Sequence, residues 1–87
     1  MDYILHGNTM TSKEAAQHHI AETFQFPDWY GGNLDALFDL LTAWTEPIVI
    51  TLLNGEQMDA ALGTYAIVLR RVFADAAAQN PNIILTF

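Results

Sequence analysis

Two carboxylates four residues apart, those of Asp35 and Asp39, are the side chains in this sequence whose types and spacing best suit chemistry. In a helix, residues at this spacing are neighbours on one face, and like charges there repel each other by roughly 0.2–0.5 kcal/mol. A helix stabilised only by its own side chains would avoid the pair. Paired carboxylates can perform acid/base catalysis, contribute to a metal site or face a positively charged partner.

Aromatic side chains accompany the two carboxylates. Trp29 and Tyr30 precede the expected helix, and Phe38 shares the helix face of the carboxylates, as does Thr42. Aromatic residues around fixed charges are the usual composition of a hot spot in a protein–protein interface. An ordinary solvated polar face is the alternative explanation of the aspartates. Trp29 could also plug the helix junction, and the spacing 34, 37, 41, 44 places Trp44 in the core.

A hydrolase that uses the same two carboxylates is one alternative function. Such pairs normally sit in a sugar-sized cleft and come from separate elements of larger folds, whereas here both lie on one helix of an 87-residue chain. Ser12 is the only serine, its place at a helix start explains it, and no Gly-x-Ser-x-Gly motif occurs. We therefore predict that the chain is not an enzyme.

The sequence predicts neither a metal site nor a cofactor. His18 and His19 are adjacent in an expected helix and point about 100° apart, so with His6 they cannot form the three or four converging ligands of zinc. No HExxH motif, calcium loop, GxGxxG or GxxxxGK[ST] phosphate-binding loop is present. A small-molecule substrate or nucleotide therefore has no support in the sequence.

The composition favours a protein partner of opposite charge. Three basic and ten acidic residues give a formal net charge of −7, whereas binding to nucleic acid or to an anionic membrane requires clustered Lys and Arg. An acidic surface speeds encounter with a cationic protein, although excess acid can also serve solubility alone. At 87 residues with 52% hydrophobic content, residues 1–87 are expected to form a single domain.

The chain contains no cysteine, and small extracellular domains usually depend on disulfides. No positively charged start followed by an apolar segment is present, and no stretch approaches the 18 or so apolar residues of a membrane span. These observations predict a cytoplasmic location.

The first half of the chain reads as a strand and two helices. Tyr3-Ile4-Leu5 is a short apolar strand. Thr11 and Glu14 match a capping box, with Thr11 as the N-cap of a helix that ends before Pro27. Asn33 caps the second helix, which closes before Pro47.

The second half alternates strands and helices. Residues 48–53 are almost continuously apolar, which predicts a strand covered on both faces. A short helical turn over 56–61, a longer helix from 63–64 to Asn80 and a strand over 83–87 follow. Asp75 lies four residues after Arg71, so an ion pair within that helix is expected. The fold class is therefore α/β, a small three-stranded parallel sheet packed with helices.

The segment PDWYGGNLDALFDLLTAW, from Pro27 to Trp44, resembles the barstar family of intracellular ribonuclease inhibitors. The similarity extends to the opening strand with Gly7, the strand that follows Pro47, Val72-Phe73 with the acidic residue and alanine after it, and the closing strand. The motif Tyr-Gly-x-Asn-Leu-Asp-Ala-Leu-x-Asp at 30–39 is far more specific than an acidic helix alone.

The resemblance implies a barstar-like fold and a stoichiometric inhibitor of a small, basic, secreted ribonuclease of the barnase type. It implies that Asp39 occupies the position of a substrate phosphate and that Asp35 accepts hydrogen bonds from a nuclease loop. It also implies a set of further contact residues: Trp29, Gly31, Asn33, Phe38, Thr42, Trp44 and, more remotely on the last helix, Asp75.

Four positions depart from the usual family pattern. Trp29 stands where Tyr is common, Phe38 where Trp is common, Gly32 at a commonly acidic position and Asp75 in place of Glu. These changes preserve the acidic mimicry of RNA but leave the target open. The alternative is an immunity or binding protein directed at a different toxin or at a partner that is not a nuclease.

Overall fold

The computed structural model describes all residues, Met1–Phe87, as three strands, four α-helices and one 3-10 turn. In chain order they are β1 (Asp2–His6), η1 (Gly7–Thr9), α1 (Lys13–Phe24), α2 (Leu34–Thr42), β2 (Ile48–Leu53), α3 (Gly55–Leu62), α4 (Thr64–Gln79) and β3 (Ile83–Thr86). This is the predicted order of strands and helices. Most bounds differ from the prediction by one or two residues, but α2 ends at Thr42, four residues before the predicted end next to Pro47. Helix α3 forms two full turns because Met58 anchors it in the core.

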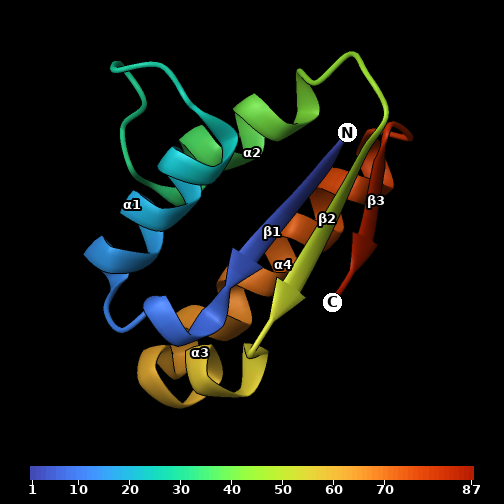
Figure 1. Ribbon diagram of the computed structural model, residues 1–87. Coiled ribbons are helices and arrows are strands. Elements are labelled where there is room, and N and C mark those ends of the chain that lie inside the picture. The colour runs from blue at the N-terminus through green and yellow to red at the C-terminus, as the bar shows by residue number, and fades with distance from the viewer.

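The three strands form one parallel sheet in the order β1-β2-β3 (Figure 1). Tyr3 is paired with Ile50, and Ile50 with Leu85, so the register brings apolar side chains to the same face of all three strands. The predicted α/β class with a three-stranded parallel sheet is therefore confirmed.

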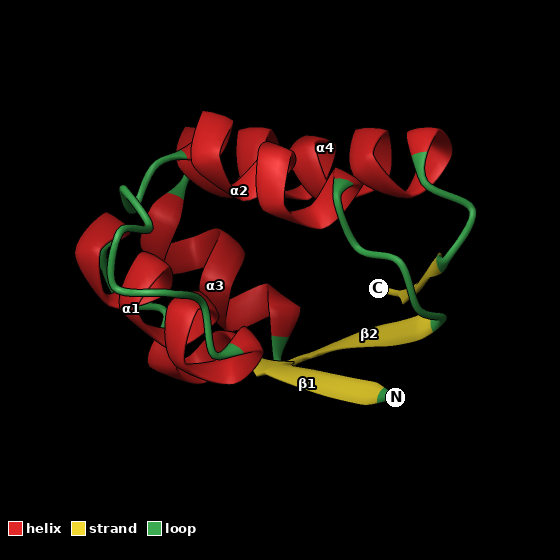
Figure 2. Ribbon diagram, turned by 90° about the horizontal axis from the view of Figure 1, so that it is seen from above, coloured by secondary structure: helices red, strands yellow, loops and turns green.

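The helices cover one face of this sheet only, and the prediction that residues 48–53 are covered on both faces is wrong. In Figure 2, α2 and α4 lie on the same side of the strands. Strand order follows chain order, and right-handed crossovers between successive strands then place their helices on one face. The outer face leaves Ile4 46% and Ile84 56% exposed.

Helix α1 begins one residue later than its predicted cap. The hydroxyl oxygen of Ser12, not of Thr11, accepts a hydrogen bond from the backbone N–H of Ala15 at 3.0 Å. Ser12 also supplies the carbonyl oxygen of the first helical hydrogen bond, from the N–H of Ala16 at 2.8 Å. Either residue type can cap a helix, so the sequence pattern alone does not separate the two positions.

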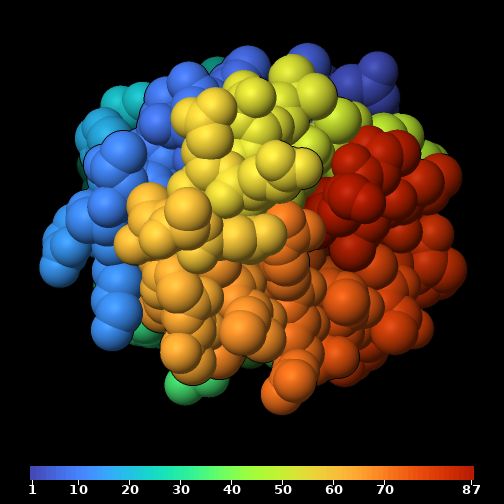
Figure 3. Space-filling view, turned by 90° about the horizontal axis from the view of Figure 1, so that it is seen from below, coloured from blue at the N-terminus to red at the C-terminus, as the bar shows by residue number.

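A single apolar cluster of 15 buried residues joins the sheet to the helices. Helix α2 contributes Leu37 and Leu41, both fully buried, and packs against α4, which contributes Leu69 and Phe73. Seen from below, α3 and the start of α4 lie beside the blue N-terminal part of the chain (Figure 3). No helix has both the length and the apolar character needed to cross a membrane.

Candidate functional site

A glycine-bent loop positions the start of α2. Gly32 has a φ of +65°, a left-handed conformation that glycine adopts without strain. Asn33 follows as the N-cap, and its side-chain oxygen accepts a hydrogen bond from the N–H of Ala36 at 2.8 Å. The predicted cap at Asn33 is confirmed, and it fixes the direction in which the helix leaves the loop.

Helix α2 separates an apolar face from an acidic one. Leu37 and Leu41 point into the core, whereas Asp35 and Asp39 are exposed. Neither carboxylate forms a hydrogen bond or an ion pair within the chain; the carboxylates that do contact a basic side chain are Glu22, beside His18, and Asp59, which is paired with Arg70. Asp35 lies in the first turn, where the helix dipole favours negative charge. Two unpartnered negative charges therefore face solvent.

Phe38 and Thr42 accompany the carboxylates, as their spacing predicts. Phe38 is half-buried and packs against the edge of the core. The Thr42 hydroxyl donates to the carbonyl oxygen of Phe38 at 2.8 Å and lies 3.2 Å from that of Asp39. Because its hydrogen is used within the helix, this hydroxyl is left as an acceptor toward the outside.

The two tryptophans differ in their packing. Trp29 is 73% exposed and does not plug the helix junction. Trp44 is half-buried, with its ring edge-on to Tyr3 at 5.6 Å and to Phe24 at 5.9 Å between centroids. Its predicted place with the core is confirmed. An indole left in solvent on the loop that leads into the acidic helix is the kind of side chain that a partner protein covers.

Asp75 lies on the solvent side of α4, the helix that packs against α2. The expected ion pair with Arg71 does not form, because no oxygen of Asp75 lies within 4.0 Å of it. An exposed pair at this spacing gains little energy and restrains two flexible side chains. The neighbouring Arg70 instead binds Asp59 of α3 through two hydrogen bonds of 2.9 and 3.0 Å.

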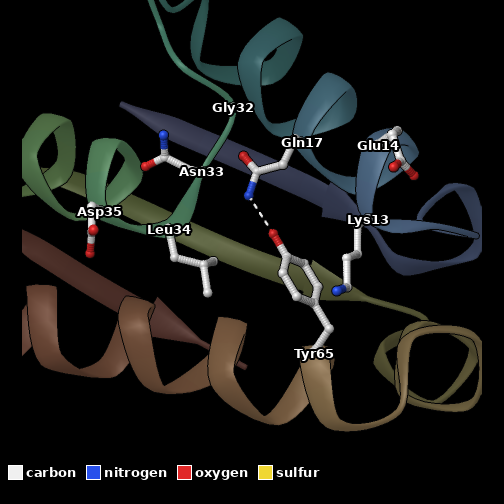
Figure 4. Close-up of a pocket in the computed structure, with 8 residues that line it drawn as sticks. All are labelled: Lys13, Glu14, Gln17, Gly32, Asn33, Leu34, Asp35 and Tyr65. Carbon is white, nitrogen blue, oxygen red and sulfur yellow. Dashed lines mark hydrogen bonds between the residues drawn. The ribbon is translucent and has the colours of Figure 1, made fainter.

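An open pocket of about 590 Å³ lies between α1, α4 and the start of α2 (Figure 4). Lys13 lies over the Tyr65 ring on one side, and Asp35 lies on the other. Gln17 donates a hydrogen bond to the Tyr65 hydroxyl at 2.7 Å and accepts one from the Tyr30 hydroxyl. Burial, with Tyr65 beside it, raises the pKa of Tyr30 to about 12, so this hydroxyl remains a donor.

Two buried polar residues that contact the α2 segment were not predicted from the sequence. They are Gln17, 7% exposed, and Asn80, 6% exposed. Gln17 shares a helix face with Ile20 and Phe24, and a polar residue within an apolar stripe is the signal that could have identified it. Asn80 was predicted only as a helix end, and nothing in its neighbourhood in the sequence indicates its long-range contacts.

The histidines serve contacts within the chain. His18 pairs with Glu22 at 2.8 Å, and the ring of His19 accepts a hydrogen bond from the backbone N–H of His6 at 2.9 Å. Burial is the main cause that lowers the pKa of His19, and the nearby His6 adds to it. No three His, Asp or Glu side chains converge as metal ligands do. The exposed carboxylates of Asp35 and Asp39 on α2 are suited instead to binding a positively charged partner.

Comparison with known proteins identifies the family of this chain. The family described as "Barstar (barnase inhibitor)" matches residues 2–85. A protein of Bacillus subtilis (strain 168) named "Putative ribonuclease inhibitor YrdF" is 36% identical over 77 residues, which cover 87% of this chain and 85% of that protein. The family match begins with β1 and ends at Leu85 within β3, so it includes the loop, α2 and α4. The chain therefore belongs to the Barstar (barnase inhibitor) family.

Proposed function

We propose that this protein is a stoichiometric inhibitor of a small, basic, secreted ribonuclease of the barnase type and acts in the cytoplasm of the cell that makes the enzyme. The observation that carries the proposal is the pair of exposed carboxylates on α2, which have no partner within the chain. The family match and the net charge of −7 support the same partner class. The protein acts by occupying the nuclease and performs no catalysis of its own.

The acidic face of α2 imitates RNA. A ribonuclease active site attracts phosphate through cationic side chains, and a carboxylate fixed on a rigid helix can take the same place. In this proposal Asp39 lies at the phosphate position and Asp35 accepts hydrogen bonds from a neighbouring nuclease loop. The dense negative charge also steers the two proteins together and accelerates association.

The other contact residues surround these two carboxylates. Trp29, Gly31 and Asn33 meet the nuclease from the loop, and Phe38 and Thr42 meet it from α2. Trp44 shapes the end of the contact while its ring remains packed on the core, and Asp75 provides a peripheral charge from α4. A central charge that loses its water on binding contributes more than a peripheral one.

The aromatic contact residues of this chain differ from the usual pattern of the family. Trp29 is highly exposed and replaces a common Tyr, whereas Phe38 is half-buried and replaces a common Trp. The largest aromatic contact has thus moved from the helix to the loop. This redistribution favours a nuclease with a broader apolar surface opposite the loop.

Titration of RNA cleavage tests the proposal. We expect barnase, or another small basic bacterial ribonuclease, to lose all activity at one equivalent of inhibitor, with an association rate that falls steeply as salt increases. A requirement for large molar excess, or association that is insensitive to salt, contradicts it.

Two other activities give different results in the same assays. A carboxylate-dependent hydrolase would cleave a glycoside or phosphoester without any added protein. An immunity protein against an unrelated toxin would leave every basic ribonuclease fully active and would protect cells against that toxin instead.

A further inference from the structure

The chain has two buried polar side chains, and each holds one end of the segment that carries α2. Gln17 contacts the loop before the helix, and Asn80 contacts the backbone after it. Every other buried side chain is apolar, or absent in the case of Gly7. Buried amides are costly unless all their hydrogen-bonding groups are used, so their concentration at these two points requires a physical explanation.

At the first end, Tyr30 is the only polar anchor of the loop. Its hydroxyl donates to Gln17 of α1, and Gln17 donates in turn to Tyr65 of α4. Figure 4 shows the second of these bonds as a dashed line. No other group of residues 27–32 forms a hydrogen bond outside that range. The Tyr30 ring also rests on Phe26, with centroids 4.8 Å apart.

At the second end, the Asn80 side chain uses both of its functional groups. Its NH₂ donates to the carbonyl oxygens of Leu41 at 3.0 Å and Trp44 at 2.9 Å. Its side-chain oxygen accepts from the N–H of Asn82 at 3.1 Å. The last turn of α2 and the chain beyond it are thereby fixed to the junction between α4 and β3.

We propose that Gln17 and Asn80 are positioning residues that hold the segment 27–44 in its docking conformation before any partner arrives. This inference rests on the proposed function, because it assigns to α2 and its loop the contact with the nuclease. Gln17 itself lies 93% out of solvent and touches no partner directly.

The physical effect is that the loop loses less conformational entropy when it binds, because it is already ordered in the free protein. A loop of this kind, with two glycines and a single polar anchor, samples many conformations when the anchor is removed. The apparent dissociation constant rises in inverse proportion to the population that can bind. If the competent population fell to a tenth, the constant would rise about tenfold without the loss of any direct contact.

The test uses four variants of the whole protein. Gln17→Leu keeps the side-chain size but removes both hydrogen bonds, and Tyr30→Phe removes the hydroxyl alone. The double variant combines them. Ile20→Val, on the same face of α1, is the matched control, because it weakens the core without touching a hydrogen bond.

Hydrogen exchange of the free protein is the first measurement, and it needs no nuclease. We expect the backbone amide of Tyr30, which bonds to the carbonyl oxygen of Pro27 at 2.9 Å, to exchange at least tenfold faster in Gln17→Leu and Tyr30→Phe, with no such change in Ile20→Val. Unchanged exchange at this amide in folded Gln17→Leu overturns the inference.

Binding to barnase is the second measurement. We expect the dissociation constant to rise about tenfold in each single variant and no further in the double variant, because both substitutions remove the same hydrogen bond between Tyr30 and Gln17. The dependence of association on salt should not change, since no charge is altered. Additive losses in the double variant, or an unchanged constant, overturn the inference. If wild-type protein does not bind, the proposed function fails, and the exchange result still decides whether Gln17 fixes the loop.

Asn80→Ala examines the other end in the same two measurements. Its removal leaves the carbonyl oxygens of Leu41 and Trp44 without this donor, so the hydrogen-bonded backbone amides of Ala43 and Trp44 should exchange faster. Where this variant is too unstable to purify, Asn82→Ala removes only the 3.2 Å contact with Trp44 and gives a smaller effect in the same direction. Protection of the Ala43 and Trp44 amides equal to wild type, in whichever of the two variants is measured, contradicts the role of Asn80.

Discussion

The imidazole of His19 accepts a hydrogen bond from the backbone N–H of His6 at 2.9 Å and joins α1 to the end of β1. Only a neutral ring can accept this bond. Burial, together with the nearby His6, lowers the pKa of His19 below 6.5, and Glu22 opposes this effect only in part. The folded protein therefore binds fewer protons here than the unfolded chain.

This relationship predicts a loss of stability in mild acid. Stability rises with pH wherever the unfolded state binds more protons, so the contribution of His19 is complete above about pH 6.5 and is lost as the pH falls through its lowered pKa. Urea unfolding at pH 7.5 and 5.5 measures the loss. His19→Gln keeps a side chain that can accept from His6 but cannot titrate, and should flatten this dependence. His18→Gln is the control, and an equal flattening there contradicts the assignment.

Replacement of Asp39 by alanine should weaken the complex more than replacement of Asp75. Truncation of one member of a buried, hydrogen-bonded charge pair costs about 2–5 kcal/mol, which corresponds to about 30- to 5,000-fold in affinity. An exposed peripheral pair contributes at most about 1 kcal/mol. Titration calorimetry of both variants with the nuclease gives the ranking. Equal losses would contradict the central position assigned to Asp39.

The double variant Asp35→Asn/Asp39→Asn should abolish inhibition while the fold persists. Both side chains are exposed and unpaired, so their neutralisation removes a like-charge repulsion, which offsets the loss of the favourable interaction of Asp35 with the helix dipole. The salt dependence of any residual association should also become shallower. Circular dichroism and RNA-cleavage titration check the two halves of the prediction, and full potency in this variant excludes phosphate mimicry by α2.

The two tryptophans should separate binding from stability. Trp29→Ala should leave the urea midpoint nearly unchanged, because the ring is 73% exposed, but should weaken inhibition. Trp44→Ala should lower the free energy of unfolding by about 3 kcal/mol, since it removes aromatic packing at the edge of the core. Unfolding curves and inhibition constants are measured on both. A large loss of stability in Trp29→Ala contradicts its exposed position.

Gly7 should tolerate no side chain. A Cβ atom there would lie 2.3 Å from the carbonyl oxygen of Asn54, which is backbone and cannot move freely. We expect Gly7→Ala to destabilise the fold by about 1–3 kcal/mol or more. Gly32→Asn is the contrasting variant, because nothing lies within 4 Å and Asn tolerates positive φ. The order of the two urea midpoints is the check, and a reversed order contradicts the contact at Gly7.

Most of the fold follows from local patterns. The apolar strand at 48–53, the cap at Asn33 and the stripe through Leu69 and Phe73 each reflect a period or a local hydrogen bond that neighbouring residues determine. The choice of Ser12 over Thr11 could not be predicted, because the two residue types cap helices for the same reason. The outer face of the sheet is uncovered because the strand order places all the helices on the other face. The continuous apolar composition of residues 48–53 does not indicate that strand order.

The charged residues of the candidate site were predictable from the sequence, but the buried polar residues that hold α2 and its loop in place were not. Asp35 and Asp39 are on one face because of helix geometry alone. The expected Arg71–Asp75 pair failed because its free energy is too small to fix two exposed side chains. Gln17 and Asn80 contact residues 13 and 36–39 positions away, and no pattern within one helix encodes such contacts.

The hydrogen bonds by which Asn80 attaches the end of α2 have an evolutionary consequence. Its amide binds main-chain oxygens, which are the same whatever side chains the helix carries. Mutations at the outward positions of α2 therefore alter what the protein recognises without loosening the attachment of the helix. Under the proposed function, a lineage whose target nuclease changes in sequence can revise this surface one residue at a time while the scaffold beneath it stays constant.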